Sequence, residues 1–398
     1  MEWKEYQIQD VCRLINGRAY SNDEMLEHGK YKIVRVGNLS GGNSTWFYSD
    51  LELPADKYCH NGDLLFAWAC TFGPHIWKED NTIFHYHIWK IVEDKDVVDR
   101  RFFYYYLKFA TGGFLGALNG SVMVHITKSS MEKMIIRIPK KLEDQRRIAS
   151  ILSSLDQKIE LNNKINADLE EMAQAIFKNW FVDFVPFKDG KFVDSELGMI
   201  PEGWKVGRAD DFYQINIGKT PPRKEHIWFS TNPADKIWVS IANMGNSGIF
   251  ISDSSEYLTK EAVDRHNIIM VPRNTILLSF KLTVGRVAIA DKELTTNEAI
   301  ARFILSDDKY MEYLYLYLKK YDYNSLGSTS SIATAVNSKT IKGMQMLQPS
   351  DNVIDAFHIQ VNPIFEKIRS LTKENSRLSL LRDTLLPRLM SGELEVPE

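Results

Sequence analysis

Two stretches of the chain repeat their apolar residues at the spacing of a coiled coil. The first runs from Leu142 to about Lys178, and the second from Asp351 to about Leu386. Neither stretch contains glycine, and Pro363 is the only proline within them. Apolar residues recur at alternating intervals of four and three residues over about four heptads, as in helices that pack along one seam. The pattern therefore predicts two long helices that pair with each other.

Both predicted helices keep the same register, because matching seam positions differ by 209, as Asn375 and Asn166 do. We expect these two asparagines to fix the register, since a buried amide needs a partner amide. Arg382 replaces an apolar residue at one seam position. The alternative is two unrelated amphipathic helices, each packed on its own domain, but unrelated helices need not share an offset. The residues predicted to pair the helices are Ile148, Leu152, Leu155, Ile159, Asn166 and Leu169 in the first, and Ile364, Ile368, Leu371, Asn375 and Leu378 in the second.

The segments that precede the two helices also match each other loosely. Residues 62–66 and 274–278 both show a turn followed by a buried-strand pattern. Each copy continues with a helix rich in aromatic residues and a loop with glycine and serine, and ends at Pro139 or Pro349. Tyr104 and Tyr313 lie in these aromatic helices and are predicted to be core residues. A period near 209 is too long for a solenoid, so the chain is predicted to be a tandem duplication.

The predicted fold belongs to the α/β (α+β) class. Two globular domains are joined by two long helices that pair as an antiparallel coiled coil, with a pseudo-two-fold internal repeat. The predicted segments are 1–141, 142–184, 185–350 and 351–398. An antiparallel pair would place the domains at opposite ends of helices that span roughly 55 Å, more than one turn of duplex DNA. This arrangement suits the recognition of two separated half-sites, although the pattern alone does not require DNA as the ligand.

Charge and composition exclude several classes of protein. The 398 residues carry 49 basic and 52 acidic side chains, so the net charge is −3. This balance excludes a protein that coats polyanions along its whole surface, such as a histone, but it allows a local DNA-binding face. No apolar stretch approaches the length of a membrane span, and the N-terminus lacks a signal-peptide pattern. Three cysteines without a Cys-x-x-Cys pair indicate a reducing compartment, so the chain is predicted to be cytoplasmic.

Motifs for catalysis and cofactor binding are missing from the sequence. The Gly218-Lys-Thr220 segment lacks the earlier glycine of a phosphate loop and runs into Pro221 and Pro222. His75, His85 and His87 with Cys70 could suggest a metal cluster. His85 and His87 share one face of a strand-like run, but no third ligand has recognisable spacing. There is no nucleophile elbow, zinc-protease motif or S-adenosylmethionine loop. The chain is therefore predicted to bind and assemble, with no catalytic residue, metal or cofactor of its own.

The sequence resembles the specificity (S) subunit of type I restriction–modification enzymes over essentially its whole length. The segments that carry the resemblance are Trp180-Phe-Val-Asp-Phe184, Leu197-Gly-Met-Ile-Pro-Glu-Gly-Trp204, Gly218-Lys-Thr-Pro-Pro222, Thr283-Val-Gly-Arg-Val-Ala288, Thr296-Asn-Glu-Ala-Ile300 and Leu385-Leu-Pro-Arg-Leu-Met-Ser-Gly-Glu-Leu394. The first domain departs from this pattern, because Phe72-Gly-Pro74 lacks the Gly-Arg step and Tyr86-His87 replaces Glu-Ala.

The resemblance implies that each globular domain recognises one half of a bipartite target in double-stranded DNA. It implies that the helices set the gap and dock two methyltransferase (M) subunits, which carry S-adenosylmethionine and methylate an adenine flipped from the stack. The ATP- and Mg-dependent nuclease would lie on separate restriction (R) subunits. The acidic residues of the helices are predicted to form a solvated or partner-facing surface, and they are Glu143, Asp144, Glu160, Glu170 and Glu171.

Candidate DNA contacts follow from the chemistry of bases and phosphates. Base edges are recognised by arginine, lysine, asparagine and glutamine, whereas phosphates are bound by cations, backbone amides and hydroxyls. The competing interpretation for each candidate is an ordinary solvated side chain. The candidates are Arg18, Asn43, Trp46, Lys78 and His85 in the first domain, and Lys219, Arg223, Lys224, Lys281, Arg286 and Asn297 in the second.

Three other functions compete with this interpretation. A close alternative is the recognition subunit of a related bipartite system of the type IIB kind, whose partner fuses nuclease and methyltransferase. A stand-alone nuclease is opposed by the missing motifs. A coiled-coil scaffold without DNA affinity would show no salt-dependent binding to duplex DNA, because phosphate contacts release counterions.

Overall fold

The computed structural model describes residues 1–397, except 40–43, 70–71, 118–125, 247 and 327–335. The chain forms two compact units. Unit 1 comprises residues 1–159 with 377–398, and unit 2 comprises residues 160–376. The predicted boundaries at 142 and 351 coincide with the first residues of two helices, whereas the compact units divide the chain inside those helices. Each unit therefore contains a globular part and a portion of both helices.

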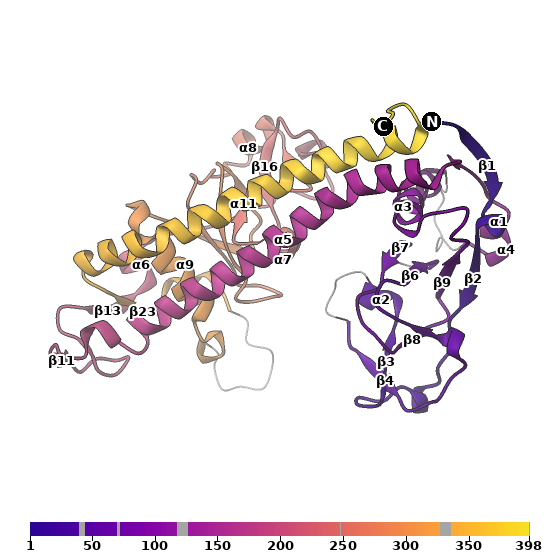
Figure 1. Cartoon of the computed structure of the whole chain (residues 1–398). Helices are drawn as coiled ribbons and strands as arrows, with labels where there is room; N and C mark the ends of the chain where they lie inside the picture. Colours follow the sequence, from indigo (N-terminus) through magenta and orange to yellow (C-terminus); the bar gives the residue numbers. More distant parts are fainter. Residues whose placement is uncertain (40–43, 70–71, 118–125, 247, 327–335, 398) are drawn as a thin grey trace. The chain divides into compact units, whose positions relative to one another are not determined.

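The two long helices are α5 (Leu142–Phe181, 40 residues) and α11 (Asp351–Ser391, 41 residues), drawn in magenta and yellow in Figure 1. Both begin where the predicted pattern begins. The second helix continues past the predicted end near Leu386, and it contains Pro363 in its interior. No helix within the described part of the chain is long and apolar enough to cross a membrane.

In unit 1 the helices pack with opposite chain directions. Ile148 and Leu152 of α5 are fully buried in one apolar cluster with Leu386 and Leu389 of α11. At the next level, Arg382 donates to the carboxylate of Asp156 over 2.6 Å, which explains how the seam accommodates an arginine. The predicted seam residues Leu155, Ile159 and Leu378 are half-buried in this unit.

In unit 2 the two helices also pack antiparallel. The Phe357 ring of α11 lies 6.3 Å from the Phe177 ring and 4.8 Å from the Phe181 ring of α5. At the far end of this stretch, Asn162 donates to the amide oxygen of Asn375 over 2.8 Å. Of the predicted seam residues, Ile368 and Leu371 are buried, and Leu169 and Ile364 pack partly buried against the core. The prediction of an antiparallel helix pair is confirmed.

The predicted pairing of Asn166 with Asn375 is wrong. Asn375 instead exchanges hydrogen bonds with Asn162 and Asn163, each of 2.8 Å. The side-chain oxygen of Asn166 is buried and has no hydrogen-bond partner among the described residues. The reason is geometric, because antiparallel helices bring position 162 opposite 375 and therefore 166 near the level of 371. Equal positions in the two repeats do not face each other.

The acidic residues of α5 were predicted to form a solvated or partner-facing surface, but some of them make contacts inside the units. Glu170 accepts a hydrogen bond from the Tyr315 hydroxyl over 3.1 Å and lies 3.6 Å from the ammonium of Lys319. Asp144 is mostly buried and pairs with Arg147 at 3.8 Å. Glu143, Glu160 and Glu171 are exposed. Part of the acidic surface therefore stabilises the unit itself.

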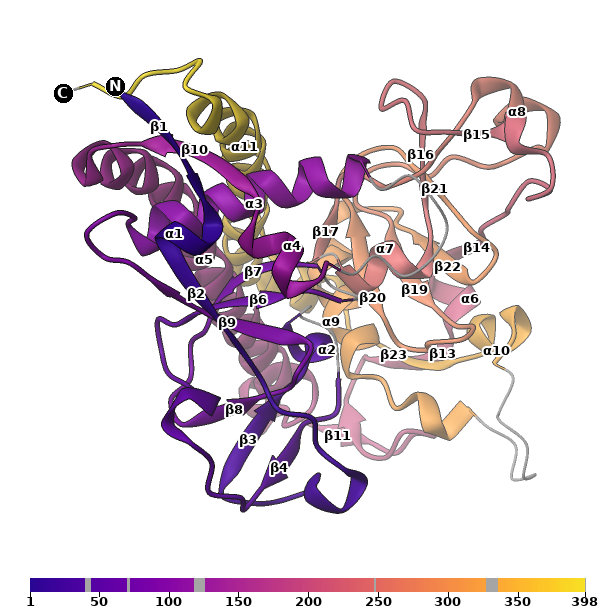
Figure 2. The same cartoon turned by 90° about the vertical axis from the view of Figure 1, so that its right-hand side faces the viewer.

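The globular part of unit 1 contains two four-stranded sheets and a two-stranded ribbon. The first sheet has the order β2 (Cys12–Asn16), β9 (Ile88–Glu93), β6 (Leu64–Ala67), β7 (Gly73–Ile76). The second has the order β4 (Phe47–Ser49), β3 (Tyr31–Val34), β8 (Thr82–Phe84), β5 (Tyr58–Cys59). In the ribbon, β1 (Trp3–Gln7) pairs antiparallel with β10 (Ile135–Pro139), as Figure 2 shows. The helices are α1 (Ile8–Val11), α2 (Val36–Leu39), α3 (Arg100–Ala117) and α4 (Lys128–Glu132).

Unit 2 repeats this plan, with one additional strand in the first sheet, a different edge strand in the second sheet and a second ribbon. That sheet has the order β14 (Gln214–Ile217), β22 (Ile300–Ile304), β19 (Ile276–Ser279), β20 (Val287–Ala290), β17 (Phe250–Ile251). The second has the order β15 (Phe229–Ser230), β18 (Tyr257–Leu258), β16 (Lys236–Val239), β21 (Thr295–Thr296). The ribbons are β13 (Lys205–Arg208) with β23 (Gln345–Gln348), and β11 (Phe192–Val193) with β12 (Ile200–Pro201). The helices are α6 (Ala209–Phe212), α7 (Ile241–Asn246), α8 (Lys260–Arg265), α9 (Met311–Lys320) and α10 (Ser338–Lys342).

The duplication predicted from the sequence is confirmed by corresponding strand pairs and turns. The parallel pair β3 with β8 in unit 1 corresponds to the parallel pair β16 with β21 in unit 2. The turns before β6 and β19 both require a left-handed residue, Gly62 with φ 88° and Asn274 with φ 69°. Tyr313 in α9 is buried as predicted, and Tyr104 in α3 is half-buried. The predicted loops at 120–121 and 327–331 lie outside the described residues.

Candidate nucleic-acid interface

In unit 1 the end of β2 is held against the end of β8. The Gly17 amide donates to the carbonyl of Ile88 over 3.1 Å, and the next amide, of Arg18, donates to the carbonyl of Phe84 over 3.0 Å. A Cβ atom on Gly17 would lie 2.3 Å from the carbonyl oxygen of His85, so only glycine allows this approach. Two predicted DNA contacts, Arg18 and His85, are thereby brought side by side.

In unit 2 the same junction joins the end of β14 to the end of β21. The Gly218 amide donates to the carbonyl of Ile300 over 3.1 Å, and the Lys219 amide to the carbonyl of Thr296 over 2.8 Å. A Cβ atom on Gly218 would lie 1.9 Å from the carbonyl oxygen of Asn297. Lys219 and Asn297 therefore occupy the positions that Arg18 and His85 occupy in unit 1. We refer to these two places as the glycine junctions.

The arginine of the unit 1 junction is engaged by a neighbouring carboxylate. Arg18 donates two hydrogen bonds to Glu24, of 2.9 and 2.6 Å, and lies over the Tyr20 ring at 5.2 Å. The hydrogen bonds from Arg18 lower the pKa of Glu24 to about 2, so the carboxylate is ionised at neutral pH. About a third of the Arg18 side chain remains exposed, at 34%.

Aromatic and imidazole rings cluster next to this arginine. The ring centroids are 4.4 Å apart for His85 and Tyr86, 3.9 Å for Tyr86 and His87, and 5.0 Å for His87 and Trp68. Burial, with smaller effects from the charges of His87 and Arg35, lowers the pKa of His85 to about 4. Burial also lowers the pKa of His87. Both imidazoles are therefore neutral at pH 7, and each offers one hydrogen-bond donor and one acceptor.

An aromatic hollow of about 330 Å³ opens beside the junction of unit 1. Trp68 stacks on Trp89 with ring centroids 5.8 Å apart, and its indole N–H donates to the carbonyl of Tyr86 over 2.9 Å. The indole is thus satisfied, and its ring presents apolar surface to the hollow. The described residues that line it are Asn16, Gly17, Trp68, Tyr86, Trp89, Ile126, Thr127 and Lys128. Sequence reasoning missed this site, although Tyr86-His87 departs from the family pattern.

Charged groups dominate near the junction of unit 2. Arg223 makes a bidentate pair with Glu256, with distances of 2.8 and 3.0 Å. Its guanidinium lies over the rings of Phe229 and Trp238, at 4.2 and 4.5 Å. Half of the Arg223 side chain is exposed, at 50%, so a fixed cation faces solvent.

Further cations surround a carboxylate at this junction. Lys219 donates to the carbonyl of His266 over 2.6 Å, and the Thr220 hydroxyl donates to Glu298. Although burial opposes the shift, the Thr220 hydrogen bond and the charges of Lys281 and Arg223 lower the pKa of Glu298. Arg223 and Lys281, predicted from separate motifs, therefore lie near one carboxylate, that of Glu298.

Three other predicted contacts, Arg286, Trp46 and Asn297, also make contacts inside their own domains. Arg286 donates to the carbonyl of Ile241 over 2.9 Å and holds α7 in place. Trp46 lies under the Lys32 ammonium at 4.0 Å and packs against the core. The Asn297 side-chain oxygen accepts a hydrogen bond from the Ala299 amide over 3.2 Å.

The remaining candidates are on the surface or cannot be placed. Lys78, Lys224 and Lys281 are exposed. Asn43 lies outside the described residues.

The cysteines and histidines do not form a recognisable metal site in the described structure. No group of three or more histidine, cysteine, aspartate or glutamate side chains could hold an ion among the described residues, and Cys70 lies outside them. Cys12 and Cys59 are buried free thiols, and burial raises the pKa of both to about 12. Such thiols are neutral and unreactive at pH 7.

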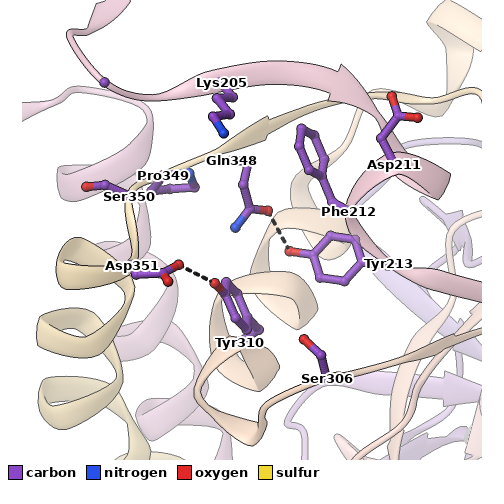
Figure 3. Close-up of a pocket in the computed structure, with 11 residues that line it drawn as sticks. Lys205, Asp211, Phe212, Tyr213, Ser306, Tyr310, Gln348, Pro349, Ser350 and Asp351 are labelled. Carbon is purple, nitrogen blue, oxygen red and sulfur yellow. Dashed lines mark hydrogen bonds between the residues drawn. The ribbon is translucent and has the colours of Figure 1, made fainter.

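A polar hollow of about 560 Å³ in unit 2 lies where β23 leads into α11 (Figure 3). The Tyr213 hydroxyl donates to Gln348 over 3.2 Å, and the Tyr310 hydroxyl donates to Asp351 over 2.5 Å. These polar groups are engaged with one another. The hollow therefore serves as a joint that ties the globular part to the first turn of α11.

Two copies of one module, each with a glycine junction and each anchored to a pair of antiparallel helices, define a duplicated recognition protein. A model of the type I restriction modification DNA specificity domain matches residues 1–171 and 201–351. The chain belongs to this family.

Relatives and a solved structure agree with this assignment. The chain is 28% identical to the type I restriction enzyme HindI specificity subunit of Haemophilus influenzae, over 99% of the chain and 100% of that protein. It is 31% identical to the MjaIX specificity subunit of Methanocaldococcus jannaschii, over 76% of the chain and 71% of that protein. The S subunit of a type I system from M. genitalium has the same fold, with a TM-score of 0.57 and 15% identity over 98% of this chain and 96% of that one.

Proposed function

We propose that this chain is the DNA specificity subunit of a type I restriction–modification enzyme, and that each unit recognises one half of a bipartite target. The observation that carries the proposal is the pair of glycine junctions. The same backbone contact recurs in both repeats, yet it presents Arg18 and His85 in one unit and Lys219 and Asn297 in the other. Such an arrangement suits the recognition of two different half-sites, because the backbone of the module stays the same while the side chains at the junction differ.

The two junctions suit different base contacts. In unit 1, the neutral imidazoles of His85 and His87 supply donors and acceptors, and Tyr86 supplies an apolar face for a thymine methyl group. In unit 2, Arg223 and Lys281 supply cations for phosphates or guanine, and Glu298 supplies an acceptor for a cytosine amino group. The two half-sites are therefore expected to differ in sequence.

The paired helices are proposed to set the gap between the half-sites and to dock the partner subunits. A helix of 40 residues spans roughly 60 Å, more than one turn of duplex DNA. The exposed carboxylates of Glu143, Glu160 and Glu171 would repel phosphates, so we assign this surface to two methyltransferase subunits. In this proposal the chain is non-catalytic and acts in the cytoplasm. S-adenosylmethionine, ATP and Mg²⁺ are bound by the methyltransferase and restriction subunits.

The decisive experiment is modified-base sequencing of DNA from cells that express this chain together with its methyltransferase subunit. We expect methyladenine at a split motif only when the chain is present. Exchange of residues 1–141 for those of a relative should change one half of the motif and leave the other. Methylation that is indifferent to the chain would refute the proposal and favour a scaffold without DNA affinity.

A further inference from the structure

Leu282 projects from the tip of the loop between β19 and β20, and it is 99% exposed. Its backbone has φ 62°, and the amide of Thr283 donates to the carbonyl of Lys281 over 2.6 Å. These features describe a three-residue turn with a positive φ at its centre, which is rare and strained. A bulky side chain is disfavoured in this conformation, where glycine or asparagine is usual.

The strained turn is held from below by a buried serine. The Ser279 hydroxyl is fully buried, donates to the carbonyl of Thr283 over 2.5 Å, and accepts from the amide of Arg286 over 3.0 Å. The Gly285 amide adds a hydrogen bond of 3.0 Å to the Ser279 carbonyl. These hydrogen bonds hold the backbone of the loop tip, and the Leu282 side chain is left exposed to solvent. Strain that the surroundings enforce is typical of functional positions.

The residues around Leu282 suit contact with a nucleic acid. Lys281 precedes it, is exposed, and lies with Arg223 near Glu298 at the glycine junction of unit 2. Of the other apolar residues in this loop, Phe280 is buried and Val284 is 37% exposed. One projecting leucine beside cations matches a ligand with charged edges and an apolar interior, which is the composition of stacked DNA.

We propose that Leu282 is an apolar wedge that inserts between two stacked bases in the half-site that unit 2 recognises. This inference rests on the proposed function and deepens it. Leucine is among the side chains that unstack a base step when they enter from a groove. Pyrimidine–purine steps unstack most easily, so the wedge favours a TA or CA/TG step at its point of entry. Unit 2 thereby selects sequence through deformability at a position where it forms no hydrogen bond to a base.

The test uses the full complex with its methyltransferase subunits and a duplex that carries 2-aminopurine at successive positions of the half-site. That half-site is the one that remains unchanged when residues 1–141 are exchanged. Binding of the unchanged protein should raise the fluorescence at one step that is distinct from the adenine flipped by the methyltransferase. Leu282→Met should retain the rise, because methionine also inserts. Leu282→Asn, which tolerates the positive φ, should abolish the rise and weaken binding about tenfold or more.

The matched control is Ile135→Ala, which removes a comparably exposed aliphatic side chain (68%) from β10 of unit 1. It should leave the fluorescence and affinity at this half-site unchanged. If Leu282→Asn keeps the fluorescence rise and the affinity, the wedge is refuted while the proposed function stands. If Leu282→Asn instead prevents assembly with the methyltransferase, the leucine contacts protein and the wedge is also refuted. If the unchanged complex shows no sequence-specific binding, the proposed function fails and the wedge fails with it.

Discussion

The two glycine junctions share a backbone and differ in chemistry. In unit 1 the arginine is held by Glu24, and the surroundings are neutral imidazoles and aromatic rings. In unit 2 the corresponding place holds Lys219 and the cations that surround Glu298. The glycine contact does not depend on these side chains. The module can therefore change the side chains at this place without changing how it folds, and the following variants test that separation.

The largest effect is expected from the glycines themselves. Gly218→Ala places a Cβ 1.9 Å from a backbone oxygen, and Gly17→Ala places one 2.3 Å away, so strands must separate. We expect each to lower the free energy of unfolding by about 3 kcal/mol or more. Each should abolish recognition of its own half-site. Urea unfolding and modified-base sequencing measure the two effects.

The control for this comparison is Gly248→Ala in unit 2. A Cβ there would meet nothing within 4 Å, and the residue does not require a positive φ. It should behave as the unchanged protein does. If Gly218→Ala were as stable as Gly248→Ala, the close approach at the junction would not hold the module together.

The next variant contrasts the polar contacts between the helices. Unit 1 uses the ion pair of Arg382 with Asp156, whereas unit 2 uses Asn375 with Asn162. Asn375→Leu removes hydrogen bonds to Asn162 and Asn163, while the buried Asn162 keeps its bond to Glu374, and the change should cost about 1–2 kcal/mol. Adding Asn162→Leu should recover much of that loss, because two apolar side chains can replace a buried amide pair.

Neither asparagine variant should alter the methylated sequence. Denaturant unfolding of the single and double variants measures the coupling, and modified-base sequencing measures specificity. A change in the motif without a loss of stability would show that the helix contact helps to select bases.

A smaller effect is expected from the imidazole at the unit 1 junction. Because the pKa of His85 is lowered to about 4 in the folded chain, the unfolded state binds more protons between about pH 4 and 6.5. The stability that His85 contributes is therefore present above pH 6.5 and is lost as the pH falls toward 4. After allowance for partial exposure, this is about 1 kcal/mol.

His85→Asn gives unit 1 the residue type that unit 2 has at the corresponding position, Asn297, and should remove this pH dependence. Unfolding curves at pH 4.5 and 7.5 measure it, with Asn297→Gln in unit 2 as the control. Equal pH dependence before and after His85→Asn would contradict a buried neutral imidazole. Recognition by unit 1 should be insensitive to pH between 7 and 8.

The smallest effect separates function from stability in unit 2. Leu282→Asn should raise the free energy of unfolding by about 0.5 kcal/mol, because asparagine accepts the positive φ that leucine resists. The variant that loses the wedge would thus be the more stable protein. Calorimetry of the chain measures the change, and a lower melting temperature would show that the turn is not strained.

The sequence predicted the larger elements well because each rests on a local pattern. Heptad spacing located the first residues of α5 and α11, and the turns at Gly62 and Asn274 located two buried strands. The four junction residues were among the candidates because their side chains can bind bases or phosphates. The partner of Asn375 was predicted wrongly, because the constant offset describes the duplication whereas antiparallel packing determines which residues face each other.

What the sequence could not show depends on contacts between distant residues. Trp68, Tyr86 and Trp89 form one hollow only because β6 and β9 are neighbours in the sheet. Arg286 has the charge expected of a DNA ligand, but its guanidinium is used to hold α7. Leu282 would be assigned to the core by its side chain, and only the fold shows that it is exposed.

The ribbons at the base of each module have a consequence for how such proteins change. The strand that begins each module, β1 or β13, pairs with the strand that ends it, β10 or β23, and a long helix follows directly. The chain therefore enters and leaves a module at one place. Insertions or deletions within the module alter a loop whose two ends remain tied, so they do not rotate or shift the helix that follows. A whole module can therefore be replaced during evolution by one of a different length, while the long helix that follows it keeps its position.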